Sequence, residues 1–132
     1  MNIIADTNVL VRAITGDHPE QSKAAEAALS GADLVALPLS ALCELVWILS
    51  RGYDLPFDKV AEAVRRLVNT ANVVADRPAV EAGLAFMAAG ADFADGVIDY
   101  EGRWLGADVF VSFDQRAVRI LKNLGKSALS LL

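Results

Sequence analysis

The chain has 132 residues, of which 55% are hydrophobic, with a formal net charge of −5 and a pI near 4.7. This length suits one domain with a real hydrophobic core. The apolar runs are all well below the ~20 residues of a membrane span, so no membrane segment is expected. The acidic balance argues against a protein held to nucleic acid by bulk charge alone, although it leaves room for a local basic surface.

In chain order, we predict a strand at 3–6, helices at 8–14 and 19–30, a strand at 34–37, helices at 40–51 and 58–68, a strand at 72–75, helices at 77–89 and 93–105, a strand at 109–113, a helix at 114–124 and a strand at 128–131. Ser40 is expected to cap the third helix. Strands that alternate with helices predict an α/β fold, with a mostly parallel sheet covered by helices on both faces.

Two features of the sequence indicate the cytoplasm. The N-terminus lacks the basic start and long apolar stretch of a signal peptide. The single cysteine, Cys43, excludes an intrachain disulfide and fits a reducing compartment. Cys43 falls in an apolar helix, so we expect it to act as a small buried hydrophobe.

Four acidic residues end or interrupt apolar stretches: Asp6, Glu44, Asp95 and Asp114. Two follow predicted strands directly, and the other two fall about one turn into predicted helices. In parallel sheets, ligands bind beyond the carboxyl ends of the strands, so all four can reach the same rim. Carboxylates that converge there would repel one another until a divalent cation neutralises them. Hard oxygen ligands of this kind suit Mg²⁺ or Mn²⁺.

The ordinary alternatives for these acids stay open. Asp6 and Asp114 could simply cap the helices that follow them, which is the commoner role of an Asp after a strand. Glu44 could lie on the solvated face of a partly buried helix. These readings concern each residue alone, whereas the metal-site hypothesis concerns the four together.

The motifs around the four acids are Asp6-Thr7-Asn8-Val9-Leu10, Glu44-Leu45-Val46-Trp47, Asp95-Gly96-Val97-Ile98 and Ser112-Phe113-Asp114. Their order and spacing resemble those of a PIN-domain ribonuclease, and most of all the VapC toxins of bacterial type II toxin–antitoxin modules. The resemblance implies a single PIN-like domain over residues 1–132. It also implies a three-layer α/β/α sandwich with a mostly parallel central sheet of about five strands.

The resemblance further implies that Asp6, Glu44, Asp95 and Asp114 bind Mg²⁺ or Mn²⁺ and activate water, which would make the protein an endoribonuclease. Water attack would leave a 5′-phosphate and a 3′-hydroxyl, and a metal would offset the charge that builds on the phosphate. In the family pattern, polar residues also stand beside the acids, at the positions of Asn8 and Ser112. We expect these two to orient Asp6 and Asp114.

Asp95 has acidic neighbours on its own helical face. Asp92 and Asp99 lie three and four residues away, and like charges at that spacing repel by roughly a few tenths of a kcal/mol. A bound cation would relieve this repulsion. The family motif points to Asp95 as the primary ligand, with Asp92 as a helper. Asp99 departs from the family pattern and stays unassigned.

A cationic stripe on the last helix is the candidate RNA contact. It comprises Arg116, Arg119, Lys122 and Lys126, opposite an apolar face of Ala117, Ile120, Leu121 and Leu124. Its first turn could contact phosphates near Asp114. Arg12 is a second candidate. The alternative is the solvated outer face of an ordinary amphipathic helix.

Other functions and the partners follow from the same residues. An inactive PIN-like domain that binds protein or RNA is the main alternative. A phosphatase of the haloacid dehalogenase type would need a second Asp two residues after Asp6, where this chain has Asn8. A VapC-like toxin would bind a VapB-like antitoxin and commonly form a homodimer. The helices at 40–51 and 58–68 are the expected interface, with a core role for most of their side chains as the alternative.

Overall fold

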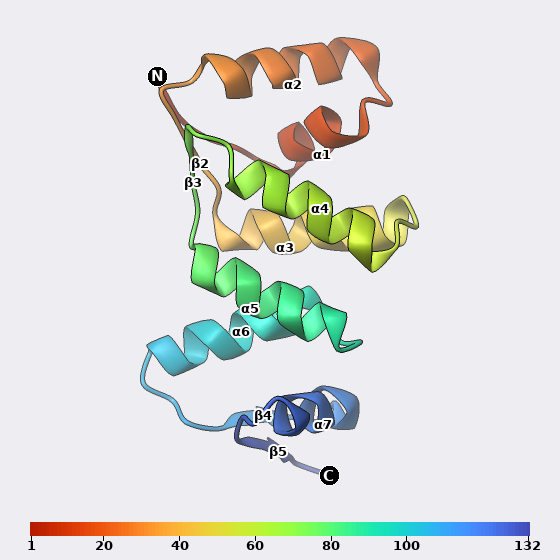
Figure 1. The fold of residues 1–132 in the computed structure, drawn as a ribbon, viewed down its shortest axis with the longest axis vertical. Helices are drawn as coiled ribbons and strands as arrows, with labels where there is room; N and C mark the ends of the chain where they lie inside the picture. Colours follow the sequence, from red (N-terminus) through yellow and green to blue (C-terminus); the bar gives the residue numbers. More distant parts are fainter. The chain divides into compact units, whose positions relative to one another are not determined.

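The computed structural model describes residues 1–132, which form two compact units, Met1–Asp76 and Arg77–Leu132. Figure 1 shows the path of the chain through both units. The longest helix has 13 residues. No helix combines the length and the apolar character that crossing a membrane requires.

The first unit is built around a three-stranded parallel sheet in the order β1-β2-β3. Its register aligns Ile3 with Val35, and Val35 with Val73. The elements of this unit are β1 (Asn2–Ile4), α1 (Thr7–Thr15), α2 (Pro19–Gly31), β2 (Leu34–Ala36), α3 (Leu39–Trp47), the π-helical turn η1 (Ile48–Gly52), α4 (Phe57–Val68) and β3 (Val73–Val74).

The second unit contains a two-stranded parallel sheet, β4-β5, in which Phe110 aligns with Ala128 and Ser112 with Ser130. Its elements are α5 (Arg77–Ala88), α6 (Phe93–Trp104), β4 (Phe110–Ser112), α7 (Gln115–Asn123) and β5 (Ala128–Ser130).

The predicted α/β class is confirmed, and each predicted strand and helix is present within a few residues of its expected position. All strand pairs are parallel, as expected. The strands form one sheet of three and one of two. The third predicted helix ends differently from the expectation, because its last turn, Ile48–Gly52, is π-helical.

The predicted helix cap at Ser40 is wrong. The residue before α3 is Pro38, and no side chain caps this helix. Pro38 has no N–H and a φ of −62°, which suits the entry to a helix, and its carbonyl accepts the N–H of Leu42. The helix therefore begins one residue before Ser40.

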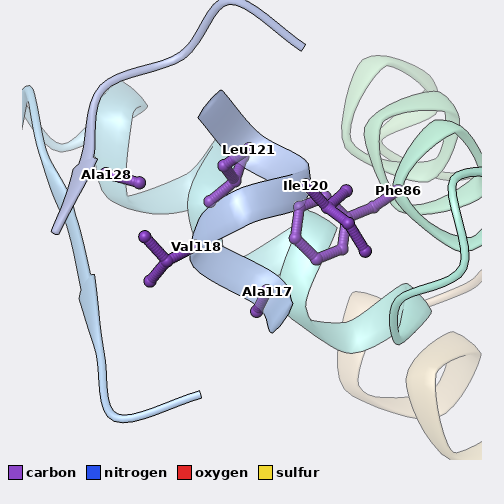
Figure 2. Packing of buried hydrophobic residues seen from close by; sticks show 6 residues of the cluster. All are labelled: Phe86, Ala117, Val118, Ile120, Leu121 and Ala128. Carbon is purple, nitrogen blue, oxygen red and sulfur yellow. The ribbon is translucent and has the colours of Figure 1, made fainter. Parts of the chain in front are cut away.

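A cluster of buried apolar side chains is centred on α7 in the second unit (Figure 2). Its members are Phe86, Ala117, Val118, Ile120, Leu121 and Ala128. Phe86 comes from α5 and Ala128 from β5, so α7 is packed against both elements. Leu124, which we expected on the apolar face, is 45% exposed, because it follows the last helical residue.

A buried ion pair fastens α6 to the loops that enter β4 and β5. Asp99 is only 6% exposed, and both its oxygens accept Nε–H of Arg103, at 2.9 and 3.1 Å. The other guanidinium nitrogens of Arg103 donate to the carbonyls of Asp108 and Ser127. Asp99, which the sequence left unassigned, therefore has a structural role and its charge is compensated.

Two glycines allow α5 and α6 to pack very closely. A Cβ added to Gly96 would lie 2.7 Å from the carbonyl oxygen of Ala82 and 2.8 Å from the Cα of Gly83. A Cβ on Gly83 would lie 2.6 Å from the ring of Phe93. These contacts involve backbone and a buried ring, so they cannot move aside cheaply. The crossing fixes the first turn of α6, which carries Asp95.

We predict that Gly96→Ala destabilises the protein by roughly 1–3 kcal/mol, because the new methyl group overlaps the backbone of α5. Gly102→Ala is the matched control in the same helix, where an added Cβ meets nothing within 4 Å. This change should stabilise by up to about 1 kcal/mol, through helix propensity. Urea denaturation followed by circular dichroism measures both values. Equal effects of the two substitutions would contradict the close crossing.

Candidate functional site

Asp6 stands at the junction of β1 and α1, where it caps the helix. Its Oδ1 accepts the backbone N–H of Thr7 at 2.8 Å, and its carbonyl accepts the N–H groups of Val9 and Leu10. The cap engages Oδ1 and leaves Oδ2 outside these hydrogen bonds. The alternative that Asp6 caps the following helix is therefore confirmed. The cap uses only one oxygen, so it is compatible with a second role for the same carboxylate.

Thr7 joins Asp6 to the second acid of this unit. Its side chain is buried, and its Oγ1 donates to Oε2 of Glu44 at 2.9 Å. Glu44 itself is exposed and projects from α3. The contact holds the Glu44 carboxylate at the start of α1, next to Asp6. Sequence reasoning gave Thr7 no role, and the available signal was its place directly after Asp6 in the first motif.

A cleft of about 450 Å³ brings these residues together. It is lined by Asp6, Thr7, Asn8, Val11, Arg12, Glu44, Ile48 and Tyr53. Asn8 and Arg12, both predicted from the sequence, thus border the same space as the two acids. The Arg12 guanidinium also donates to Gln21 at 2.7 Å and to Asp17 at 3.2 Å. The cleft therefore holds two carboxylates and one positioned cation.

Asp114 occupies the equivalent junction in the second unit, between β4 and α7. Its Oδ1 accepts the N–H groups of Arg116 and Ala117, at 3.0 and 3.1 Å. Ser112 Oγ accepts the N–H of Asp114 at 2.9 Å. Ser112 thus fixes the backbone at Asp114. Oδ2 takes no part in the cap, as in Asp6.

Asp95 lies in the first turn of α6, close to two other acids. Burial raises the pKa of its carboxyl, and the nearby charges of Asp92 and Asp114 raise this pKa further. Asp92 precedes the helix, but its side chain caps nothing. The structure therefore brings Asp92, Asp95 and Asp114 into one region of negative charge.

The four principal acids fall two in each unit, with Asp6 and Glu44 in the first and Asp95 and Asp114 in the second. Within its own unit, none of them forms a salt bridge. Neither unit gathers three or more His, Cys, Asp or Glu side chains closely enough to hold a metal ion by itself. The donors are carboxylate oxygens, the kind of ligand that Mg²⁺ and Mn²⁺ prefer.

Three cations of the predicted stripe, Arg116, Arg119 and Lys122, are exposed on α7. The fourth, Lys126, is also exposed, but its predicted place on this helix is wrong, because α7 ends at Asn123. The guanidinium of Arg116 extends over the turn between α5 and α6, since a Cβ on Gly90 would lie 3.0 Å from it. This turn leads directly to Asp92 and α6. Arg116 therefore borders the acidic region of the second unit.

We predict that Asp95→Asn raises the free energy of unfolding at pH 7 by roughly a few tenths of a kcal/mol. A carboxyl whose pKa is raised in the folded state opposes folding while it is charged, and this penalty disappears as the pH falls through that pKa. The gain should therefore vanish in acid. Thermal denaturation at several pH values tests this, with Glu101→Gln in the same helix as the control. A loss of stability at pH 7 would contradict the inference that burial and the charges of Asp92 and Asp114 disfavour the ionised Asp95 carboxylate.

Comparison with known families agrees with this arrangement. A family model, the PIN domain, matches residues 3–123, which include all four acids. No curated protein is significantly similar to the chain. PIN domains are typically nucleases, generally use divalent metals, and many act on RNA. Because the match covers nearly the whole sequence, the chain belongs to the PIN-domain family.

Proposed function

We propose that the protein is an Mg²⁺- or Mn²⁺-dependent endoribonuclease, and that it is the toxin of a VapBC-type toxin–antitoxin pair. In this proposal residues 1–132 act as a single PIN domain in the cytoplasm. Asp6, Glu44, Asp95 and Asp114 are the metal ligands and the catalytic acids. Asn8, Asp92 and Ser112 support them.

The observation that carries the proposal is the cleft that Asp6 and Glu44 share. Two carboxylates that form no salt bridge line one cleft, and each accepts a hydrogen bond from Thr7. Two like charges held beside one another repel. A bound cation would offset this repulsion. The crowding of Asp95 by Asp92 and Asp114 gives the same argument in the second unit.

The chain's own residues supply position and charge for phosphodiester hydrolysis. A bound divalent metal would lower the pKa of water and stabilise the charge that develops on the phosphate. The helix caps fix Asp6 and Asp114 at one oxygen each, and Oδ2 of each remains for metal binding. Arg12, Arg116 and Arg119 would contact phosphates of the RNA.

The proposed partners are RNA, a VapB-like antitoxin and a second copy of the chain. Most apolar side chains of α3 and α4 are buried in the core. This agrees with the core role that we gave as the alternative to an interface role. Trp47 is the exception, with 64% of its surface exposed. It is the part of these helices that remains available to a partner.

Asp6→Asn should abolish cleavage and leave the fold intact. The amide can still cap α1, because Asn is as good a cap as Asp, but it lacks the charge that binds metal. Total RNA incubated with purified protein, with and without Mg²⁺ or Mn²⁺, provides the assay. The products should carry 5′-phosphates. Thermal denaturation checks the fold.

Asp58→Asn is the matched control, since Asp58 is an exposed acid in the first turn of α4. It should leave cleavage unchanged. Metal-dependent cleavage by the Asp6→Asn variant at the wild-type rate would remove Asp6 from the site. If the wild-type protein cleaves no RNA with either metal but binds it, the inactive interaction module is the better description.

The double change Arg116→Glu and Arg119→Glu should weaken RNA binding and flatten its salt dependence. Each phosphate contact contributes roughly 0.7 to the salt slope for single strands. Affinity is measured in an Asp6→Asn background, so that the RNA stays intact. Lys23→Glu with Lys59→Glu, two exposed residues of α2 and α4, gives the same change in net charge. Equal effects of both pairs would mean that the stripe acts only through bulk charge.

A further inference from the structure

Tyr53 lies in the cleft of Asp6 and Glu44, although neither its sequence context nor the family motifs point to it. It follows the π-helical turn η1, and its N–H donates to the carbonyl of Ile48 at 3.1 Å. The next residue, Asp54, has a φ of 54°, in the left-handed region. Tyr53 therefore lies between a π-helical turn and a left-handed residue, and it lines the cleft. Single π-helical turns are frequent at functional sites.

The Tyr53 ring is held in place by its hydroxyl group. The hydroxyl donates to Oδ2 of Asp17 at 2.6 Å. Oδ1 of Asp17 accepts hydrogen bonds from Thr15 Oγ1, at 2.8 Å, and from the Arg12 guanidinium, at 3.2 Å. The hydrogen bonds from Tyr53 and Thr15, together with the charge of Arg12, lower the pKa of the Asp17 carboxyl. One ionised carboxylate therefore fixes both an aromatic ring and a cation beside the cleft.

The cleft thus offers three kinds of contact to a nucleotide. Asp6 and Glu44 supply the acidic part, Arg12 supplies a cation, and Tyr53 with Val11 supplies an aromatic and aliphatic wall. Its volume of about 450 Å³ falls within the range of small-molecule sites, roughly 300–1,000 Å³. A base stacks on any aromatic face, and a face that is already immobilised loses little entropy when it does so.

We propose that Tyr53 is a binding residue that stacks on a base of single-stranded RNA next to the acidic part of the cleft. Arg12 contacts a phosphate of the same segment, and Asp17 is the positioning residue that holds both. This inference rests on the proposed ribonuclease function. It assigns a single-stranded substrate to the cleft, since a base within a duplex cannot present its face to Tyr53.

The test compares a short RNA with the same RNA lacking one base. Both are bound in an Asp6→Asn background, and a 2-aminopurine at the matching position reports stacking by quenching of its fluorescence. The parent should prefer the complete RNA by about tenfold, as one base–aromatic stack implies. Tyr53→Leu should remove the preference and the quenching. Tyr53→Phe keeps the ring without the hydrogen bond, so it should keep most of both.

Tyr100→Leu is the matched control, because Tyr100 is a half-buried tyrosine in α6 of the second unit. It should change neither quantity. Persistence of the base preference and quenching in Tyr53→Leu would overturn the stacking role, and the nuclease proposal would stand. If Tyr53→Leu does not fold, the parent and Tyr53→Phe decide alone, since absence of quenching in both overturns the proposal.

The nuclease proposal fails separately. Wild-type protein that cleaves no RNA with Mg²⁺ or Mn²⁺, but still shows the base preference through Tyr53, would keep the stacking site and reject the enzyme. Absence of any RNA binding would reject both.

Discussion

The parallel pairing of every strand is the constraint on which both units depend. Parallel neighbours cannot be joined by a tight hairpin, so β1, β2 and β4 each lead into a helical crossover to the next strand. The first N–H groups of each helix then lack partners. Asp6 and Asp114 satisfy them at the ends of β1 and β4. The fold thus places a carboxylate at these two junctions for structural reasons, and the cap leaves the second oxygen of each outside its hydrogen bonds.

The position of Asp95 depends on packing instead. Glycine inside a helix costs about 1 kcal/mol relative to alanine, and α5 and α6 each contain one at their crossing. In return, the two helices approach so closely that a Cβ added to Gly96 would lie within 3 Å of backbone atoms of α5. Because Asp95 directly precedes Gly96, the crossing holds it near Asp92 and Asp114, where its pKa is raised. Close packing and concentrated charge are therefore coupled in this unit.

The sequence predicts the strands and helices well, because they follow from local hydrophobic periodicity. It fails at Ser40, where a preceding proline decides the start of the helix. Of the two missed contacts, one is distant in the sequence and one is local. Thr7 meets Glu44 across 37 positions, and no local signal announces the pair. Asp99 looks like one more member of an acidic face until Arg103 is seen to neutralise it. The caps of Asp6 and Asp114 could be expected from sequence, because they are local, whereas the contact between Thr7 and Glu44 could not.

The caps at Asp6 and Asp114 also bear on how such a chain evolves. Aspartate and asparagine codons differ by a single base, and asparagine caps a helix as well as aspartate does. One transition in the gene at either position therefore yields a protein that keeps its helix and its surface but has lost a negative charge. The charge at either junction can therefore be lost without a change of fold.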